Sequence, residues 1–217
     1  MTTDHKTDFE SAAANWDEKP RRVRLSHDIG RAIKTSVQFG PDMDVLDFGC
    51  GTGLLTMQIQ PFVRSITGVD SSPAMLDVLK QKVEAEKSAN VYWRCLDVEN
   101  GDSIAGTYDV IVSAMTLHHI KDAAALLEQF YRVCRRGGTL CIADLDAEDG
   151  GFHEDNQGVF HFGFERAAMR QAFAEAGFDP VKDTTASEIV KSDATGGQKR
   201  FTIGLTIGRK TDDASGC

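Results

Sequence analysis

At residues 45–53 the chain reads Val45-Leu46-Asp47-Phe48-Gly49-Cys50-Gly51-Thr52-Gly53. The apolar run at residues 44–48 predicts a buried strand, and a helical pattern at residues 54–60 follows the glycines. Glycines at alternate positions let the backbone turn tightly and approach a ligand that a Cβ atom would push away. A G-x-G pattern is weak evidence alone, but here it ends a strand and opens a helix, as expected of a ligand-binding turn.

Aspartates follow the next two predicted strands, at residues 66–69 and 91–96. Asp70 stands where a carboxylate accepts hydrogen bonds from both hydroxyls of a ribose, although an acidic helix start is an alternative interpretation. Asp97 is placed to accept from the amino group of an adenine, with a solvated loop aspartate as its alternative. The dinucleotide motif requires G-x-G-x-x-G, and Leu54 follows Gly53 directly, which makes a dinucleotide the poorer match.

Strand and helix patterns alternate outward from this turn. Further helices are predicted at residues 26–37, 123–135 and 165–176, another from Ser72-Pro73 onward, and further strands at 108–114 and 139–143. Gly137-Gly138 is expected to end the helix before it, as Gly177 ends the helix at 165–176. Two late strands, within residues 180–190 and 201–207, flank a predicted turn at Gly196-Gly197. The pattern predicts an α/β fold, a Rossmann-like doubly wound mostly parallel sheet with an antiparallel edge strand and helices on both faces.

The 217 residues suit one domain, expected at 1–210, with a helical N-terminal cap at 1–40 and a possible lid at 144–164. Residues 1–8 and the tail at 211–217 are expected to be disordered. A formal net charge of −9 disfavours a nucleic-acid partner, since the phosphate backbone is also negative. The basic stretch at residues 19–34 is interpreted as a solvated helix face, with an anionic-ligand role as the alternative.

No apolar run is long enough for a membrane span, and no secretory signal is evident, so the sequence predicts a cytoplasmic protein without membrane insertion. The five cysteines form no C-x-x-C pair and mostly lie in apolar stretches. A disulfide framework or cysteine zinc site is therefore not expected. The sequence makes no prediction of oligomeric state.

Taken together, these motifs resemble class I S-adenosylmethionine-dependent methyltransferases of the small-molecule type. The resemblance covers about residues 45–143 and is carried by five segments: Val45–Gly53, Val69–Leu76, Asp97-Val98, Tyr108–Ile111 and Arg135–Leu140. The segment Ala14–Arg21 is also similar to members whose N-terminal region folds over the cofactor.

The resemblance implies S-adenosylmethionine as cofactor and assigns its contacts. Around the methionine part it places Gly49, Cys50, Gly51 and Gly53, with Asp47 orienting the amino group and Ala114 supplying backbone nearby. It places Asp70 on the ribose, Ser71 and Met75 beside the adenine, and Asp97 with Val98 at the far edge of the base. Methyl transfer from a sulfonium is an in-line displacement, so catalysis is expected to consist mostly of alignment and exclusion of water.

Residues expected near the acceptor follow the fourth and fifth strands. His118 or His119 is a candidate general base, although a structural role for the pair is the alternative. No metal is expected, because adjacent histidines seldom bind one ion and no third ligand is evident. The acidic segment at 144–164 is either an acceptor-binding lid or a solvated loop, and His153 and His161 are its candidate acceptor contacts, together with Trp16.

The sequence therefore predicts methyl transfer from S-adenosylmethionine to a small-molecule acceptor, such as a metabolite or a quinone-like or thiol compound. Two alternatives remain open at this point. One is a nicotinamide-dependent dehydrogenase, which the glycine spacing disfavours. The other is a non-catalytic regulatory protein that binds S-adenosylmethionine, which sequence alone does not distinguish from an enzyme because the same residues would position the ligand.

Overall fold

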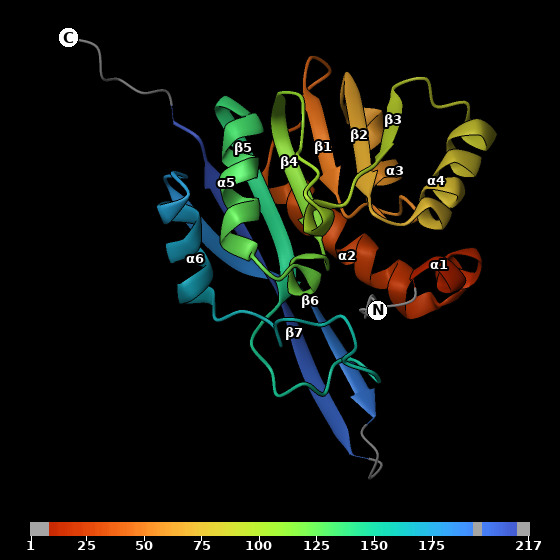
Figure 1. Cartoon of the computed structure of the whole chain (residues 1–217), viewed down its shortest axis with the longest axis vertical. Helices are drawn as coiled ribbons and strands as arrows, with labels where there is room; N and C mark the ends of the chain where they lie inside the picture. Colours follow the sequence, from red (N-terminus) through yellow and green to blue (C-terminus); the bar gives the residue numbers. More distant parts are fainter. Residues whose placement is uncertain (1–8, 193–196, 212–217) are drawn as a thin grey trace.

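A computed structural model describes residues 9–192 and 197–211. Their strands form one seven-stranded sheet in the order β3-β2-β1-β4-β5-β7-β6 (Figure 1). The strands are β1 (Asp44–Phe48), β2 (Ser65–Asp70), β3 (Val91–Cys95), β4 (Tyr108–Ala114), β5 (Cys134–Leu145), β6 (Val181–Ser192) and β7 (Gln198–Arg209). Residues 1–8, residues 212–217 of the tail predicted to be disordered from 211 onward, and Gly196 of the predicted turn lie outside the described residues.

The predicted fold class is confirmed. Strands β1 to β5 are mutually parallel, whereas β7 runs antiparallel to both β5 and the edge strand β6. The order reverses between β1 and β4, since the chain builds outward to β3 and then returns to the other side of β1. Ligands of doubly wound sheets bind beyond the carboxyl ends of the strands at this reversal.

Helices cover both faces of the sheet (Figure 1). Side chains of α2 (Pro20–Ser36), α3 (Thr56–Ile59) and α4 (Pro73–Glu86) join the buried cluster on one face. Those of α5 (Ala123–Val133) and α6 (Arg166–Glu175) join the cluster on the other. Short segments complete the chain: α1 (Phe9–Ala12) and the 3₁₀ helices η1 (Ala13–Glu18), η2 (Gln60–Phe62), η3 (Val98–Asn100) and η4 (Leu117–His119).

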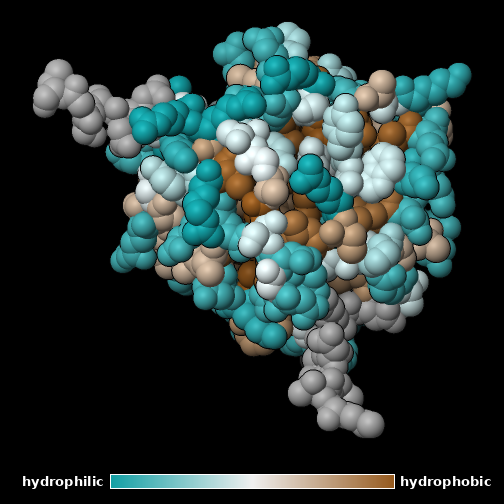
Figure 2. Space-filling model, turned by 45° about the horizontal axis from the view of Figure 1, so that its top comes forward, coloured by the Kyte–Doolittle hydropathy of each residue, from teal (hydrophilic) through white to brown (hydrophobic). Residues whose placement is uncertain are grey.

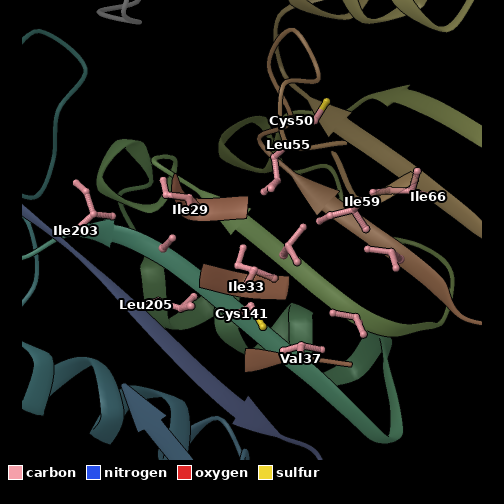
Figure 3. Close-up of a cluster of buried hydrophobic side chains, with 14 of the residues drawn as sticks. Ile29, Ile33, Val37, Cys50, Leu55, Ile59, Ile66, Cys141, Ile203 and Leu205 are labelled. Atoms are coloured by element: carbon pink, nitrogen blue, oxygen red, sulfur yellow. The ribbon is translucent and has the colours of Figure 1, made fainter. Parts of the chain in front are cut away.

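The core follows from strand alternation. On β4, Val110 and Val112 face the α2 side while Ile111 faces the α5 side, because successive side chains of a strand point to opposite faces. Figure 3 shows Ile33 of α2 near Cys141 of β5, and Ile29 belongs to the same buried cluster. The central strands are therefore apolar on both faces, as parallel strands covered by two helical layers require.

Several predicted boundaries change. Helix α2 begins at Pro20, before the predicted residue 26, since proline suits the first turn of a helix. The predicted helix at 54–60 is confined to α3 and continues as η2, which contains Pro61. Ser72 caps α4 as predicted, with its hydroxyl accepting from the backbone N–H of Met75.

The prediction that Gly137-Gly138 ends a helix is wrong. Helix α5 already ends at Val133, and the glycines lie within β5. Tyr108 pairs with Cys134 and Val110 with Thr139, so residues 135–138 bulge out of register opposite Asp109. A Cβ atom on Gly138 would lie 2.8 Å from backbone oxygens of Arg135 and Asp109, which explains the glycine there.

Candidate active site

A cavity of about 520 Å³ opens at the carboxyl ends of β1, β2, β3 and β4. The segment after each of these strands supplies part of its wall: 49–52, 70–71, 96–100 and 114–116. Its volume is typical of small-molecule sites, about 300–1,000 Å³. In Figure 2 hydrophobic side chains gather in the middle of the visible face, and hydrophilic ones surround them. The cavity lies at the position where the strand order reverses, as the sequence predicts.

The glycine turn forms the floor of this cavity. Gly51 has φ +53°, and a Cβ atom there would meet only the Met75 sulfur, at 4.0 Å, so the backbone lies open to a ligand. Gly49 and Cys50 also line the cavity. Gly53 does not, and a Cβ atom there would lie 2.3 Å from Leu79 Cδ1, which makes its role one of helix packing.

Asp70 ends β2 with its carboxylate held by the backbone. Oδ2 accepts from the N–H of Gly51 and Oδ1 from the N–H of Ser72, at 2.8 and 2.9 Å. Burial raises the pKa of Asp70, although these two N–H groups oppose the shift. A carboxylate offers about four acceptor sites, so acceptor capacity remains for a ligand beside these backbone bonds.

Asp47, near the end of β1, is almost wholly buried against the cavity. Burial raises its pKa to about 7, and the hydrogen bond that it accepts from Thr56 Oγ1 at 2.6 Å only partly opposes the shift. None of the ion pairs found among the described residues includes Asp47. A cation in the cavity would stabilise the ionised form of this carboxyl group.

The remaining predicted cofactor residues also line the cavity: Ser71, Met75, Asp97, Val98 and Ala114. Asp97 has local partners as well, since it accepts from the N–H of Glu99 at 3.2 Å and from the Asn100 amide at 2.8 Å. It therefore caps η3 while remaining in the wall. With the exception of Gly53, the structure brings every predicted cofactor residue to one cavity.

The N-terminal segment packs over this end of the sheet. Trp16 lines the cavity, and the Arg22 guanidinium stacks on its ring at 3.5 Å. Asp17 of η1 accepts from Thr52 Oγ1 at 2.7 Å and pairs with Lys82 of α4 at 2.5 Å. These polar contacts attach η1 to the glycine turn. Arg22, which belongs to the basic stretch, reaches the cavity wall.

The two predicted catalytic histidines differ in position. His119 lines the cavity, whereas His118 is buried behind it, with Nδ1 2.6 Å from Asp144 Oδ1. Burial opposes ionisation of Asp144, but His118 and the N–H of Leu145 together hold the pKa of its carboxyl group below its ordinary value. Burial, reinforced by His118, lowers the pKa of His119 to about 4. His119 is therefore neutral at pH 7 and presents an uncharged imidazole to the cavity.

The segment at 146–165, which follows β5, folds back onto η4. The N–H groups of Phe160 and His161 donate to the carbonyl of His118, and Phe160 lines the cavity. The predicted acceptor contacts in this segment do not reach the wall. His153 instead approaches His118, with their Nε2 atoms 3.2 Å apart, and His161 donates to the carbonyl of Ile120.

The sequence made no prediction for three of the wall residues, which are Phe9, Leu25 and Lys121, and it did not single out Phe160 within its segment. Phe9 packs edge to face on His119, with ring centroids 5.2 Å apart. Phe160 is 45% exposed and belongs to the aromatic run Phe160-His161-Phe162-Gly163-Phe164 at the end of the acidic segment. That aromatic run was the available signal, whereas nothing local marked Phe9.

The central part of the chain is similar to known methyltransferases. The model of a methyltransferase domain family matches residues 45–138. An uncharacterized methyltransferase of Schizosaccharomyces pombe is 33% identical over 135 residues, which are 56% of this chain and 48% of that protein. The ubiquinone biosynthesis O-methyltransferase of Acinetobacter baylyi is 28% identical over 143 residues, 64% of this chain and 60% of that protein. The chain thus spans about half the length of the curated relatives it matches.

Solved structures share the fold at lower identity. The YcgJ protein of Bacillus subtilis superposes with a TM-score of 0.68 and 17% identity, over 86% of this chain and 99% of that one. A phosphoethanolamine N-methyltransferase of Haemonchus contortus, solved with S-adenosylmethionine, superposes with a TM-score of 0.69 and 17% identity, over 95% of this chain and 60% of that one. No helix within the described ranges is both long and apolar enough to cross a membrane.

Proposed function

We propose that this chain, whose residues 45–138 match a methyltransferase domain family, is a class I S-adenosylmethionine-dependent methyltransferase that binds S-adenosylmethionine in the cavity and methylates a small-molecule acceptor. The proposal rests on the set of residues that the cavity brings together. The open glycine turn, the oriented carboxylate of Asp70 and the buried Asp47 line one cavity where the strand order reverses. An adenosyl group, a ribose and an amino-acid ammonium group present the polar groups that these residues complement.

Asp70 would bind the ribose. Its two backbone hydrogen bonds fix the carboxylate plane before any ligand arrives, which lowers the entropic cost of binding. The acceptor sites that remain on its oxygens suit two adjacent hydroxyls. The adenine would then lie against Met75 and Val98, on the side formed by the segments after β2 and β3.

Asp47 would hold the methionine end, directly or through water. The ammonium group would be the cation that this carboxyl group lacks within the described ion pairs, and its approach would favour the ionised form. The backbone of Gly49 and Ala114 lies at the same part of the wall. Together these groups would determine how deep in the cavity the sulfonium lies.

S-adenosylmethionine supplies an already activated methyl group, so the protein has to align the acceptor and exclude water. The N-terminal segment is suited to this task, since Phe9 and Trp16 cover the cavity and Phe9 packs on His119. His119 presents a neutral ring that can orient an acceptor hydroxyl or thiol. His118 would act as a positioning residue, because its hydrogen bond with Asp144 would hold η4, and with it His119, in place.

The acceptor wall favours a small molecule with an apolar body. Ile120, Met115 and Phe160 join Phe9 and Trp16 there, and they offer hydrophobic surface on several sides. Such a wall suits a ring system that carries one nucleophilic group, because the ring gains burial while the nucleophile is directed at the methyl group. We propose a quinone-like or thiol-bearing compound as the acceptor class.

The test is transfer of isotope-labelled methyl from S-adenosylmethionine into small molecules of a cell extract. The proposal predicts label in at least one low-molecular-weight product with the native chain and none with Asp70→Ala. Label confined to protein or nucleic acid would contradict the small-molecule acceptor. Binding of S-adenosylmethionine without label transfer in any fraction would indicate a non-catalytic protein, and binding of NADH in its place would indicate a dehydrogenase.

A further inference from the structure

Three histidines from two separate segments converge at the border of the cavity. His118 and His119 belong to η4, whereas His153 comes from the segment at 146–165. One ring nitrogen of each lies within 4.8 Å of the corresponding nitrogens of the other two. The methyl transfer proposed above does not require such a cluster, and therefore does not explain it.

Hydrogen bonds determine which nitrogens of the η4 histidines carry protons. Nδ1 of His118 faces the Asp144 carboxylate at 2.6 Å, and Nδ1 of His119 faces the Gly158 carbonyl at 2.7 Å. Because both oxygens accept, both Nδ1 atoms donate, which leaves Nε2 of each ring as the nitrogen available to an ion. Metal-binding histidines are held in this way, with the distal N–H directed at a carboxylate or a backbone carbonyl.

The spacing also suits a metal ion. Zinc–nitrogen bonds of about 2.0–2.1 Å at a tetrahedral angle place neighbouring nitrogen ligands about 3.3 Å apart. The Nε2 atoms of His118 and His153 are 3.2 Å apart. Because His153 is only partly buried and lies on a segment without regular structure, its ring has room to adjust toward an ion held by the η4 histidines.

We propose that His118, His119 and His153 bind one divalent transition-metal ion of the zinc type. Imidazole nitrogen suits zinc, copper, iron and nickel, whereas magnesium and calcium prefer oxygen ligands. The sequence predicts no metal because adjacent histidines lacked a third ligand, and the fold supplies that ligand from a distant segment. Three protein ligands leave a coordination position open, as in catalytic zinc sites.

The open position would border the cavity, since His119 is itself a wall residue. If the proposed methyl transfer is the function, a metal ion there would bind the hydroxyl or thiol of the acceptor and favour its deprotonated form. This role rests on the proposed function. Metal binding itself does not, so the two are tested separately.

The test uses the untagged full chain, treated with chelator and then titrated with Co²⁺ and with Zn²⁺ in the absence of S-adenosylmethionine. We expect one ion per chain, visible absorption bands of nitrogen-bound cobalt, and displacement of cobalt by zinc. His153→Ala should weaken zinc binding by at least about 100-fold, beyond the loss that follows removal of a second-shell group. His119→Gln, which removes a ligand from η4, should have a similar effect.

His161→Ala is the matched control, because His161 lies in the same segment as His153 but is bonded to the Ile120 carbonyl. Its zinc affinity should equal that of the native chain, and thermal melting should show that all three variants are folded. The proposal is overturned if the native chain takes up no cobalt or zinc. It is also overturned if His153→Ala binds as tightly as the native chain, which would leave a hydrogen-bonded histidine cluster only.

Discussion

Strand β1 carries an aspartate near each of its ends, and the two side chains have opposite environments. Asp44, at the amino end, accepts from Arg64 Nε at 2.9 Å, from Ser65 at 2.7 Å and from Arg135 at 3.0 Å. These bonds, led by that from Arg64, lower the pKa of Asp44 well below its ordinary range. Asp47, near the carboxyl end, is buried beside the cavity, and its pKa is raised to about 7.

The difference between these ends separates a structural role from a binding role. At the amino end the charges of Asp44 and Asp109 are balanced by Arg64 and Arg135, and nothing remains for a ligand to complete. At the carboxyl end, Asp47 is buried and Asp70 is partly buried, and both have raised pKa values. Carboxyl groups with pKa values raised by burial beside a cavity are characteristic of functional sites.

Removal of the Asp70 carboxylate should produce the largest loss of ligand affinity. Two hydrogen bonds from a carboxylate to ribose hydroxyls contribute about 1.5–3 kcal/mol each, so Asp70→Ala should weaken S-adenosylmethionine binding at least about 100-fold. Isothermal titration calorimetry measures the change. Asp44→Asn, at the other end of the sheet, is the matched control and should bind normally. Unchanged affinity in Asp70→Ala would remove the ribose assignment.

Ligand binding at Asp47 should depend on pH. Asp47 must be ionised to bind an ammonium group, and its pKa is about 7 in the ligand-free protein. Affinity for S-adenosylmethionine should therefore fall by up to about tenfold for each pH unit below 7 and level off above it. Calorimetry between pH 5.5 and 8.5 tests this, and Asp47→Asn should flatten the profile. A profile that is flat in the native chain would separate Asp47 from the ligand.

The same titration affects the ligand-free fold in the opposite direction. The folded pKa of Asp47, about 7, lies above its ordinary value of 3.8, so the folded state binds this proton more tightly. The contribution of Asp47 to the free energy of unfolding should be greatest below about pH 4 and should decline as the pH rises to about 7. Comparison of urea unfolding for the native chain and Asp47→Asn isolates this contribution.

Two glycines of the glycine turn should respond differently to substitution, one mainly in ligand binding and the other mainly in stability. Gly51→Ala should weaken S-adenosylmethionine binding about tenfold but cost only about 1 kcal/mol of stability, because the added methyl meets open cavity at a left-handed φ. Gly53→Ala should cost about 2–3 kcal/mol, since its methyl overlaps Leu79. Calorimetry and thermal melting separate the two effects. Equal losses of binding and stability in both variants would contradict the distinction.

The smallest effect is expected at the amino end. Asp44→Asn should lower the free energy of unfolding by about 1 kcal/mol, because partly exposed ion pairs are screened by water and salt. The folded pKa is depressed, so this stabilisation is present above about pH 4, the unfolded value, and is lost as the pH falls further. Urea unfolding at low and high salt measures it. A loss of ligand affinity in Asp44→Asn would contradict the separation of the two ends.

The sequence predicted the carboxyl end of the sheet well because its signals are local. The predicted bounds of β1 and β4 match those of the structure, and the glycine turn with Asp70 is encoded within a short stretch. The Gly137-Gly138 bulge was mistaken for a helix end because strand register between β4 and β5 determines it. Local patterns do not report register.

The acceptor side was predicted less well, because distant segments build it. Phe9 reaches His119 from the N-terminal segment, and Phe160 returns from the segment after β5. The contact of His153 with His118 likewise joins residues far apart in the chain. Such pairings depend on the completed fold, so single-residue patterns identified the histidines without showing which of them meet.

The proposed function requires one adenosyl ligand to lie between the glycine turn and Asp70. A crystal structure with bound S-adenosylhomocysteine tests it directly. We expect both ribose hydroxyls within hydrogen-bond distance of the Asp70 carboxylate and the amino group near Asp47. A ligand bound outside this cavity, or with its ribose away from Asp70, would contradict it.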